Sequence, residues 1–185
     1  MLHSLLHPLR LPDYHSIKGW EGKGNWTVKK YYQFPYRFFY RHKFRMIVDM
    51  IPKGKIYRNI LDFGTGPGIF MEELKRHALF VKGFDKGDNI DPRWKYEAIV
   101  CASVLEFCSL DLMLPLLSQI LHPKGNLLIA SPSSNWFTEG YLKLAGDKHF
   151  RNNHKTILSK VSKYFRIVEY HDWLGLYFSI KAAKK

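Results

Sequence analysis

The sequence has little of three features that would each place it in a well-defined class of protein. It contains only two cysteines, Cys101 and Cys108, among 185 residues. Two thiols seven positions apart form neither a disulfide framework nor a metal-ligand pattern, so we expect free thiols in a reducing cytoplasm. No apolar run approaches the ~18 residues of a membrane span. The short apolar start is broken by Pro8, Arg10 and Pro12, which argues against a secretory signal.

Acidic residues are also scarce beside the basic ones. Asp and Glu number 16 against 29 Lys and Arg, which makes the formal net charge +13. This excess predicts attraction to an anionic partner, namely nucleic acid, a lipid surface or an acidic substrate. Much of it lies between Lys23 and Arg45, where seven Lys or Arg and nine aromatic residues alternate without a single acid.

What the sequence does contain is typical of one globular domain with an N-terminal extension. Hydrophobic residues make up 46% of the chain, enough for a sizeable core. The first ~35 residues have no clear period, and we interpret them as an extended arm or cap. After Pro35 an apolar stripe at helical spacing begins, formed by Tyr40, Phe44, Ile47, Val48 and Ile51. We therefore predict a basic, aromatic arm and cap helix over residues 1–55 and a globular unit over residues 56–185.

Strand and helix patterns alternate through residues 56–185. We expect strands over 57–63, 79–85, 96–103 and 125–132, helices over 68–78, 109–123 and 153–165, and two closing strands around Gly175. Such alternation predicts an α/β fold, a Rossmann-like three-layer sandwich whose mostly parallel sheet is covered on both faces. The closing strands are too close for a helical crossover, so they are predicted to be antiparallel.

A glycine-rich turn, Gly64–Thr65–Gly66–Pro67–Gly68, follows the first of these strands. The carboxyl end of a strand is where open α/β sheets bind ligands. The turn lacks the Gly-Lys-Ser/Thr ending of a phosphate-binding Walker loop, and Gly68 comes one position too early for the dinucleotide pattern. Asp85 ends the second strand, 19 residues after Gly66, where a carboxylate can accept hydrogen bonds from both ribose hydroxyls. Together these features predict an adenosine cofactor.

Four segments, "ILDFGTGPGIF", "VKGFDKGD", "YEAIVCASVLEF" and "ILHPKGNLLIASP", resemble the successive motifs of class I S-adenosylmethionine-dependent methyltransferases, especially the small-molecule and lipid-type branch. The resemblance runs from about Ile56 to the C-terminus. It implies S-adenosylmethionine as the cofactor and a last strand inserted antiparallel between two others. It also implies a set of cofactor-binding residues: Asp62, Gly64, Thr65, Gly66 and Gly68 around the turn, Asp85 on the ribose, and Ala102, Ser103 and Val104 near the sulfonium.

One segment departs from the family pattern. Only eleven residues, Lys86 to Tyr96, separate Asp85 from Glu97, too few for the helix, strand and adenine-binding acid that the family has there. We therefore predict a sheet of about six strands that lacks the usual third one, with this segment as a loop over the adenine. Asp88 is the first candidate to hold the adenine, followed by Asn89, Ile90 and Asp91. A plain turn at Asp88–Asn89 is the alternative.

The catalytic machinery is harder to find in a sequence. Methyl transfer from a sulfonium requires alignment and exclusion of water, and it needs a general base only when the acceptor is protonated. His149, in the loop "GDKHFRNNH", is the first candidate base, ahead of His154, His171 and Glu106. The aromatic residues Trp136, Phe137 and Tyr141 are candidates for the wall of the acceptor pocket. No metal-ligand set is predicted.

The function predicted from these residues is methyl transfer to a small-molecule or lipid-linked acceptor in the cytoplasm. Two alternatives stay open: a non-catalytic adenosine- or nucleic-acid-binding module with the same fold, and an RNA methyltransferase. The basic, aromatic arm fits a lid over the active site, an anionic membrane surface to which the protein binds peripherally, or, less well, single-stranded nucleic acid.

Overall fold

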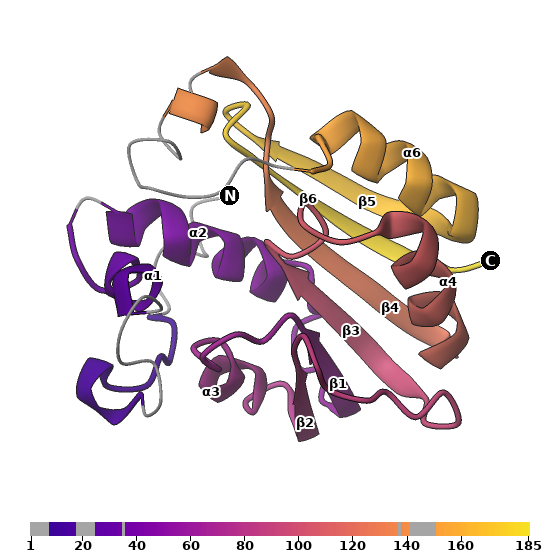
Figure 1. The fold of residues 1–185 in the computed structure, drawn as a ribbon. Coiled ribbons are helices and arrows are strands. Elements are labelled where there is room, and N and C mark those ends of the chain that lie inside the picture. Colours follow the sequence, from indigo (N-terminus) through magenta and orange to yellow (C-terminus); the bar gives the residue numbers. More distant parts are fainter. Residues whose placement is uncertain (1–7, 18–24, 35, 137, 141–150) are drawn as a thin grey trace.

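The computed structural model describes residues 8–17, 25–34, 36–136, 138–140 and 151–185. Six strands form one sheet in the order β2-β1-β3-β4-β6-β5. Figure 1 shows this sheet between two layers of helices, with α2 and α3 on one face and α4 and α6 on the other. The strands are β1 (Tyr57–Phe63), β2 (Ala78–Phe84), β3 (Tyr96–Ala102), β4 (Leu121–Pro132), β5 (Phe165–Trp173) and β6 (Tyr177–Lys184).

The direction of the strands confirms the predicted topology. β1 pairs in parallel with β2 and β3, and β3 pairs in parallel with β4. β6 is antiparallel to both β4 and β5, so the last strand is inserted between two others. Because Pro132 is paired with Tyr177, the turn between β5 and β6 lies at the same edge of the sheet as the carboxyl ends of the parallel strands.

The helices agree with the sequence pattern except after the glycine turn and in the N-terminal segment, where a short helix lies within the residues that were predicted to be extended. They are α1 (Asn25–Lys30), α2 (Tyr36–Asp49), α3 (Met71–Leu74), α4 (Leu110–Ile120) and α6 (His154–Tyr164), with a 3₁₀ turn at Tyr14–Ser16. The predicted helix over 68–78 is thus reduced to the four residues of α3. Its backbone shifts to i→i−3 bonds from Arg76 to Glu73 and from His77 to Leu74, which tighten the chain before β2 begins at Ala78.

The core consists of two apolar clusters, one on each face of the sheet. Alternate strand residues point to opposite faces: Ile60, Val100 and Leu128 to the α2 side, and Leu61, Ile99 and Leu127 to the α4 and α6 side. Parallel strands buried on both faces read as continuous apolar runs, as these do. The predicted stripe of α2 is confirmed, because Tyr40, Phe44, Ile47 and Ile51 are all buried and Val48 is partly so.

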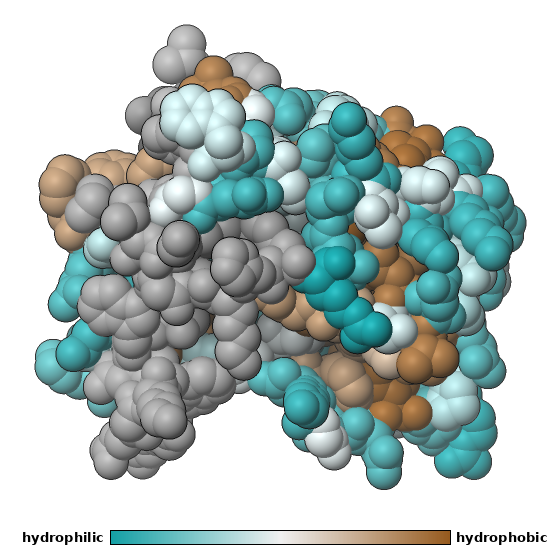
Figure 2. Space-filling view, turned by 45° about the horizontal axis from the view of Figure 1, so that its top comes forward, coloured by the Kyte–Doolittle hydropathy of each residue, from teal (hydrophilic) through white to brown (hydrophobic). Residues whose placement is uncertain are grey.

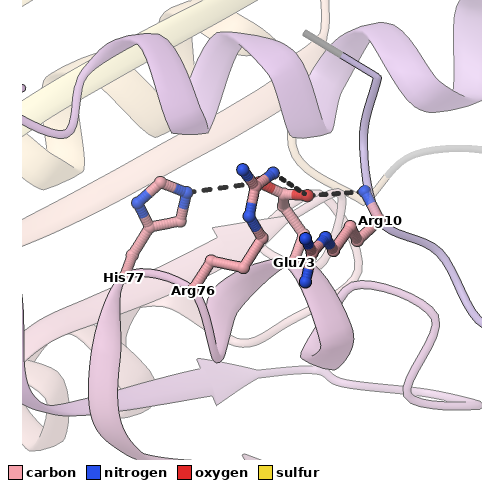
Figure 3. Close-up of polar contacts among 4 residues, drawn as sticks. All are labelled: Arg10, Glu73, Arg76 and His77. Carbon is pink, nitrogen blue, oxygen red and sulfur yellow. Dashed lines mark hydrogen bonds and ion pairs between the residues drawn. The ribbon is translucent and has the colours of Figure 1, made fainter.

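A buried acid on α3, Glu73, binds the N-terminal segment that precedes the sheet. Figure 3 shows Arg10, Arg76 and His77 converging on the carboxylate of Glu73. The backbone N–H of Arg10 donates to Oε2 at 2.6 Å, and Nη1 of Arg76 donates to Oε1 at 3.1 Å. Nε2 of His77 lies 3.2 Å from Oε1. Burial raises the pKa of Glu73, but the bonds from His77, Arg10 and Arg76 outweigh it and leave this pKa lowered.

The predicted absence of a strand after β2 is also confirmed. Residues 85–95 connect β2 to β3 with turns and no helix or strand of their own, so β2 is an edge of the sheet. Within the connection Asp91 and Arg93 form a two-pronged ion pair, with Nη2 of Arg93 at 2.8 Å from Oδ2.

The surface is mixed in polarity. Figure 2 shows one face on which, outside the grey residues, hydrophilic residues cover most of the area and hydrophobic residues form several patches among them. In the part of the chain that the structure describes, no helix has the length and apolar character needed to cross a membrane.

Candidate active site

The glycine turn after β1 is held in a conformation that requires glycine. Gly64, Gly66 and Gly68 have φ values of +79°, +50° and +72°, in the left-handed region. A Cβ on Gly64 would lie 2.4 Å from Cγ2 of Val104, so the turn packs directly against the segment after β3. A Cβ on Gly66 would meet no atom of the described residues within 4 Å. The structure therefore places Val104 against the turn, and the described residues leave open space beside Gly66. The predicted position of Val104 near the sulfonium stays a prediction.

Asp62 anchors the turn from inside the sheet. Its side chain is 2% exposed, and Oγ1 of Thr65 donates to its Oδ2 at 2.9 Å. Thr65 in turn packs on Gly83 of β2, where a Cβ would lie 2.9 Å from its Cγ2. Burial raises the pKa of Asp62 to about 6, against the lowering effects of the Thr65 hydrogen bond and of Lys43.

Asp85 stands beside the glycine turn, at the end of β2. The carbonyl of Phe84 accepts from the N–H groups of Gly64 and Thr65 at 2.8 and 3.0 Å, which joins the two segments. Oδ1 of Asp85 accepts from the N–H of Lys86 at 2.7 Å. Oδ2 of Asp88 accepts from the N–H of Asp85 at 2.8 Å, so Asp88 shapes the turn that holds Asp85. The role of Asp88 toward adenine stays a prediction.

An aromatic wall lies beside the turn, with two rings from the N-terminal segment and one, Phe70, from the start of α3. The rings of Tyr31, Phe44 and Phe70 are stacked, with centroids 5.3 Å apart for the first pair and 4.2 Å for the second. Between this wall and Asp62, Thr65 and Ala102 lies a cavity of about 30 Å³. That is room for only a few water molecules at most. The wall therefore leaves little free volume between itself and Asp62.

Lys43 of α2 is a buried cation that the sequence analysis did not single out. It is 5% exposed, and its Nζ lies 5.1 to 5.5 Å from the ring centroids of Tyr31, Tyr40 and Phe44. Its charge also acts on Asp62 and Glu106, where it opposes the rise in pKa that burial causes. Its burial could have been suspected from the sequence, because Lys43 lies on the apolar stripe, directly before Phe44 and three residues after Tyr40.

Glu106 lies in the segment after β3 and is buried as well. Oγ of Ser131 donates to its Oε2 at 2.7 Å, whereas Oε1 is buried and has no hydrogen-bond partner among the described residues. Burial raises the pKa of this carboxyl, and the hydrogen bonds from its own backbone and from Ser131 act against it. The preceding Ser103 has a φ of +56°, rare for a residue with a side chain, and its N–H donates to the carbonyl of Ala130. Glu106 is thus held by β3 and β4 together.

The other predicted residues are spread more widely. His154 begins α6 and packs against Phe178, on the α4 and α6 side of the sheet. His171 is on β5, 3.7 Å from Glu169. Trp136 is 85% exposed, so it does not form a buried wall. His149, Phe137 and Tyr141 lie outside the described residues. Among the described residues, no group of three or more His, Cys, Asp or Glu could hold a metal ion.

This arrangement of strands, with a glycine turn after β1 and an acid at the end of β2, is the fold of class I S-adenosylmethionine-dependent methyltransferases. No protein-family model matches the sequence, and no curated protein matches it either. The likeness is seen in solved structures.

Three solved methyltransferases illustrate it. The N-methyltransferase NodS from Bradyrhizobium japonicum WM9, solved with S-adenosyl-l-homocysteine, superimposes with a TM-score of 0.61 at 14% identity over 92% of this chain and 97% of its own. An O-methyltransferase family protein from Burkholderia thailandensis gives 0.62 at 13% identity, over 89% of this chain and 61% of its own. Human N-acetylserotonin methyltransferase, solved with SAM, gives 0.60 at 15% identity, over 89% of this chain and 57% of its own. At these identities the likeness establishes the fold.

Proposed function

We propose that this chain is an S-adenosylmethionine-dependent methyltransferase that acts on a small-molecule or lipid-linked acceptor. The proposal depends mainly on one observation. The Phe84 carbonyl accepts hydrogen bonds from the N–H groups of Gly64 and Thr65, and these bonds fix the glycine turn beside Asp85 at the carboxyl ends of the parallel strands. Open space at Gly66 and a carboxylate at the end of β2 are what an adenosine cofactor requires. The solved methyltransferases of the same fold support this reading.

The charged residues near the turn fit the amino-acid end of this cofactor. That end carries an ammonium and a carboxylate. Asp62 offers a carboxylate to the former, and Lys43 offers an ammonium to the latter. Asp85 accepts hydrogen bonds from the ribose hydroxyls. Because the cavity beside the turn measures only about 30 Å³, Tyr31 and Phe44 have to move outward to admit the cofactor, and they exclude water once they close over it.

Two residues are candidates to accept a proton from the acceptor. The bound cofactor supplies a methyl group already activated on a sulfonium, so a base is needed only for a protonated acceptor. His149 remains the candidate from the sequence. Glu106 fits the task from its surroundings, because no described residue bonds to Oε1 and Ser131 fixes the other carboxylate oxygen.

The lipid-linked class of acceptor is favoured by the start of α2. Phe34 and Phe38 are both exposed and meet edge to face, with ring centroids 5.9 Å apart. The guanidinium of Arg37 lies 5.5 Å from the Phe38 ring. Exposed aromatic rings beside a cation are suited to the boundary between lipid headgroups and acyl chains.

Calorimetry tests the proposal with S-adenosylmethionine and with its demethylated product. The wild type should bind both. Asp85→Ala should lose roughly 1.5–3 kcal/mol of binding free energy, about 10- to 150-fold in affinity. Gly66→Val should abolish binding, because its side chain enters the cofactor space. Asp111→Ala, which removes an exposed acid of α4, is the matched control and should bind normally.

The outcomes separate the candidate functions. Binding of RNA without either cofactor form would show the non-catalytic module instead. An unchanged dissociation constant for Asp85→Ala would remove the ribose assignment. Comparing methylated metabolites and lipids in cells with and without the protein would then identify the acceptor.

A further inference from the structure

We propose that the outer edge of β2 is a docking site for an extended strand of a partner protein. β2 ends the sheet in the observed strand order and pairs only with β1. Figure 1 shows it at the margin of the molecule, away from α4 and α6. The edge is open because residues 85–95 are too few to supply the strand that would otherwise cover it.

The backbone of this edge has the groups that a further strand needs. The N–H of Tyr57 donates to the carbonyl of His77 at 2.8 Å, which sets the phase of the parallel ladder. Residues 79, 81 and 83 then bond to β1, and residues 78, 80 and 82 direct their N–H and C=O groups outward. Among the described residues, none makes a backbone hydrogen bond to this outer side.

The exposed side chains of this edge are mostly apolar, whereas most natural edge strands carry features that prevent pairing with another chain. Leu79 is 80% exposed and Phe80 is 52% exposed. Being consecutive in a strand, they lie on opposite faces of the sheet, so an added strand would cover both at once. Edge strands are normally blunted by charge, proline, bulges or short length. β2 has seven residues and a single charged side chain, Lys82.

The charge of the molecule favours a different protein over a second copy of this chain. Two copies joined at this edge would bring together two molecules of net charge +13, each with an exposed Lys82 on the paired strand. A strand with apolar residues and an acid opposite Lys82 fits instead. In such strand addition the backbone bonds give affinity and the side chains give selectivity. The proposal is independent of methyl transfer.

The test uses a capped seven-residue peptide of alternating valine, threonine and aspartate, and the same peptide with lysine in place of aspartate. We expect the acidic peptide to bind the full chain and to slow amide exchange at Phe80 and Lys82, while the amides bonded to β1 do not change. Phe80→Pro removes an outward N–H without removing a bond to β1 and should weaken binding at least about tenfold. Phe80→Ala, which keeps that N–H, separates the backbone contribution from the side-chain contribution.

A second variant keeps the test decisive if Phe80→Pro does not fold. Lys82→Glu should reverse the preference from the acidic to the basic peptide. Failure of the acidic peptide to bind, equal binding by Phe80→Pro, or no change in exchange at Phe80 and Lys82 would each overturn the proposal. So would a dimer in sedimentation that Phe80→Pro abolishes, because the edge would then belong to a second copy of the chain.

Discussion

Asp62 carries a charge in a place where charge is unfavourable. Its pKa is about 6 in the folded protein against an ordinary 3.8. Between about pH 3.8 and pH 6, the Asp62 carboxyl therefore holds a proton in the folded state that it has already lost in the unfolded state. The stability from this group is fully present below about pH 3.8 and is lost as the pH rises through about 6. Above that, burial of the charge costs about 3 kcal/mol by the energy of a pKa shift.

The first prediction follows from this linkage. Asp62→Asn keeps an acceptor for the Thr65 hydroxyl and removes the charge, so it should stabilise the protein at pH 7.5 by up to about 3 kcal/mol. At pH 4 the gain should be close to zero. Urea unfolding at the two pH values measures the difference. Equal effects at both pH values would show that Asp62 is not charged where it is buried. The same variant should bind the cofactor more weakly, if Asp62 meets its ammonium as proposed.

His42 has the opposite dependence on pH. Burial, with help from Arg45, lowers its pKa to about 4, and its neutral ring stacks on Trp173 with centroids 3.8 Å apart. The stability from His42 is present above its ordinary pKa of 6.5 and is lost as the pH falls through about 4. His42→Phe keeps a ring on Trp173 and cannot titrate. We expect its unfolding free energy to fall less than that of the wild type between pH 6.5 and 4. A parallel fall in both proteins would contradict this.

At the scale of the element, the glycine turn and the segment after β3 support one another. Gly64 and Gly66 share a positive φ, but among the described residues only Gly64 has a neighbour in the way, Cγ2 of Val104, which would lie 2.4 Å from an added Cβ. Gly66→Ala should cost about 1–2 kcal/mol of stability, for the left-handed backbone alone. Gly64→Ala should cost clearly more.

The measurement is denaturant unfolding of both variants and of Gly64→Ala combined with Val104→Ala. The double variant should recover part of the extra loss, because the truncated side chain makes room for the new Cβ. Equal losses for the two single variants would show that Val104 does not restrict the turn.

The buried carboxylate of α3 fixes the N-terminal segment to the domain. Glu73→Gln weakens the charge-assisted bonds from Arg10 and Arg76, so we expect a loss of about 1–3 kcal/mol and faster tryptic cleavage after Arg10. Glu72→Gln is the matched control, since Glu72 is exposed and pairs with Lys75 on the same helix. It should change stability by less than about 0.5 kcal/mol. Similar cleavage of the two variants would remove Glu73 from this role.

For the whole molecule, the excess of cations predicts how the protein meets a surface. We expect the protein to co-sediment with vesicles of anionic lipid at low salt, and we expect this binding to weaken steeply as the salt concentration increases. It should not co-sediment with neutral vesicles. Replacing Phe34 and Phe38 together by serine should reduce the binding at low salt. Negligible binding to both kinds of vesicle would leave the N-terminal aromatic residues as a lid and remove the membrane from the account.

Much of the fold could be predicted because its signals are local. The alternation of strands and helices, the left-handed turn at Gly64 to Gly68 and the missing third strand each depend on residues close together in the chain. Eleven residues cannot contain a helix, a strand and their turns, whatever surrounds them. The four-residue length of α3 was not predictable, because Glu72, Lys75 and their neighbours suit a longer helix and the position of β2 ends it early.

The sequence by itself determined the succession of strands and helices along the chain, the glycine turn and the acid that follows β2, since backbone preference and apolar period act over short distances. Only the tertiary structure decided that Tyr31 and Phe44 close against the turn, that Lys43 is buried beside them, and that Glu106 is buried with Ser131 bonded to one of its oxygens. The physical reason is that burial belongs to a position in space. A lysine or glutamate has the same side chain on a solvated surface as in a core, and its energetics change only when distant segments pack around it and remove the water.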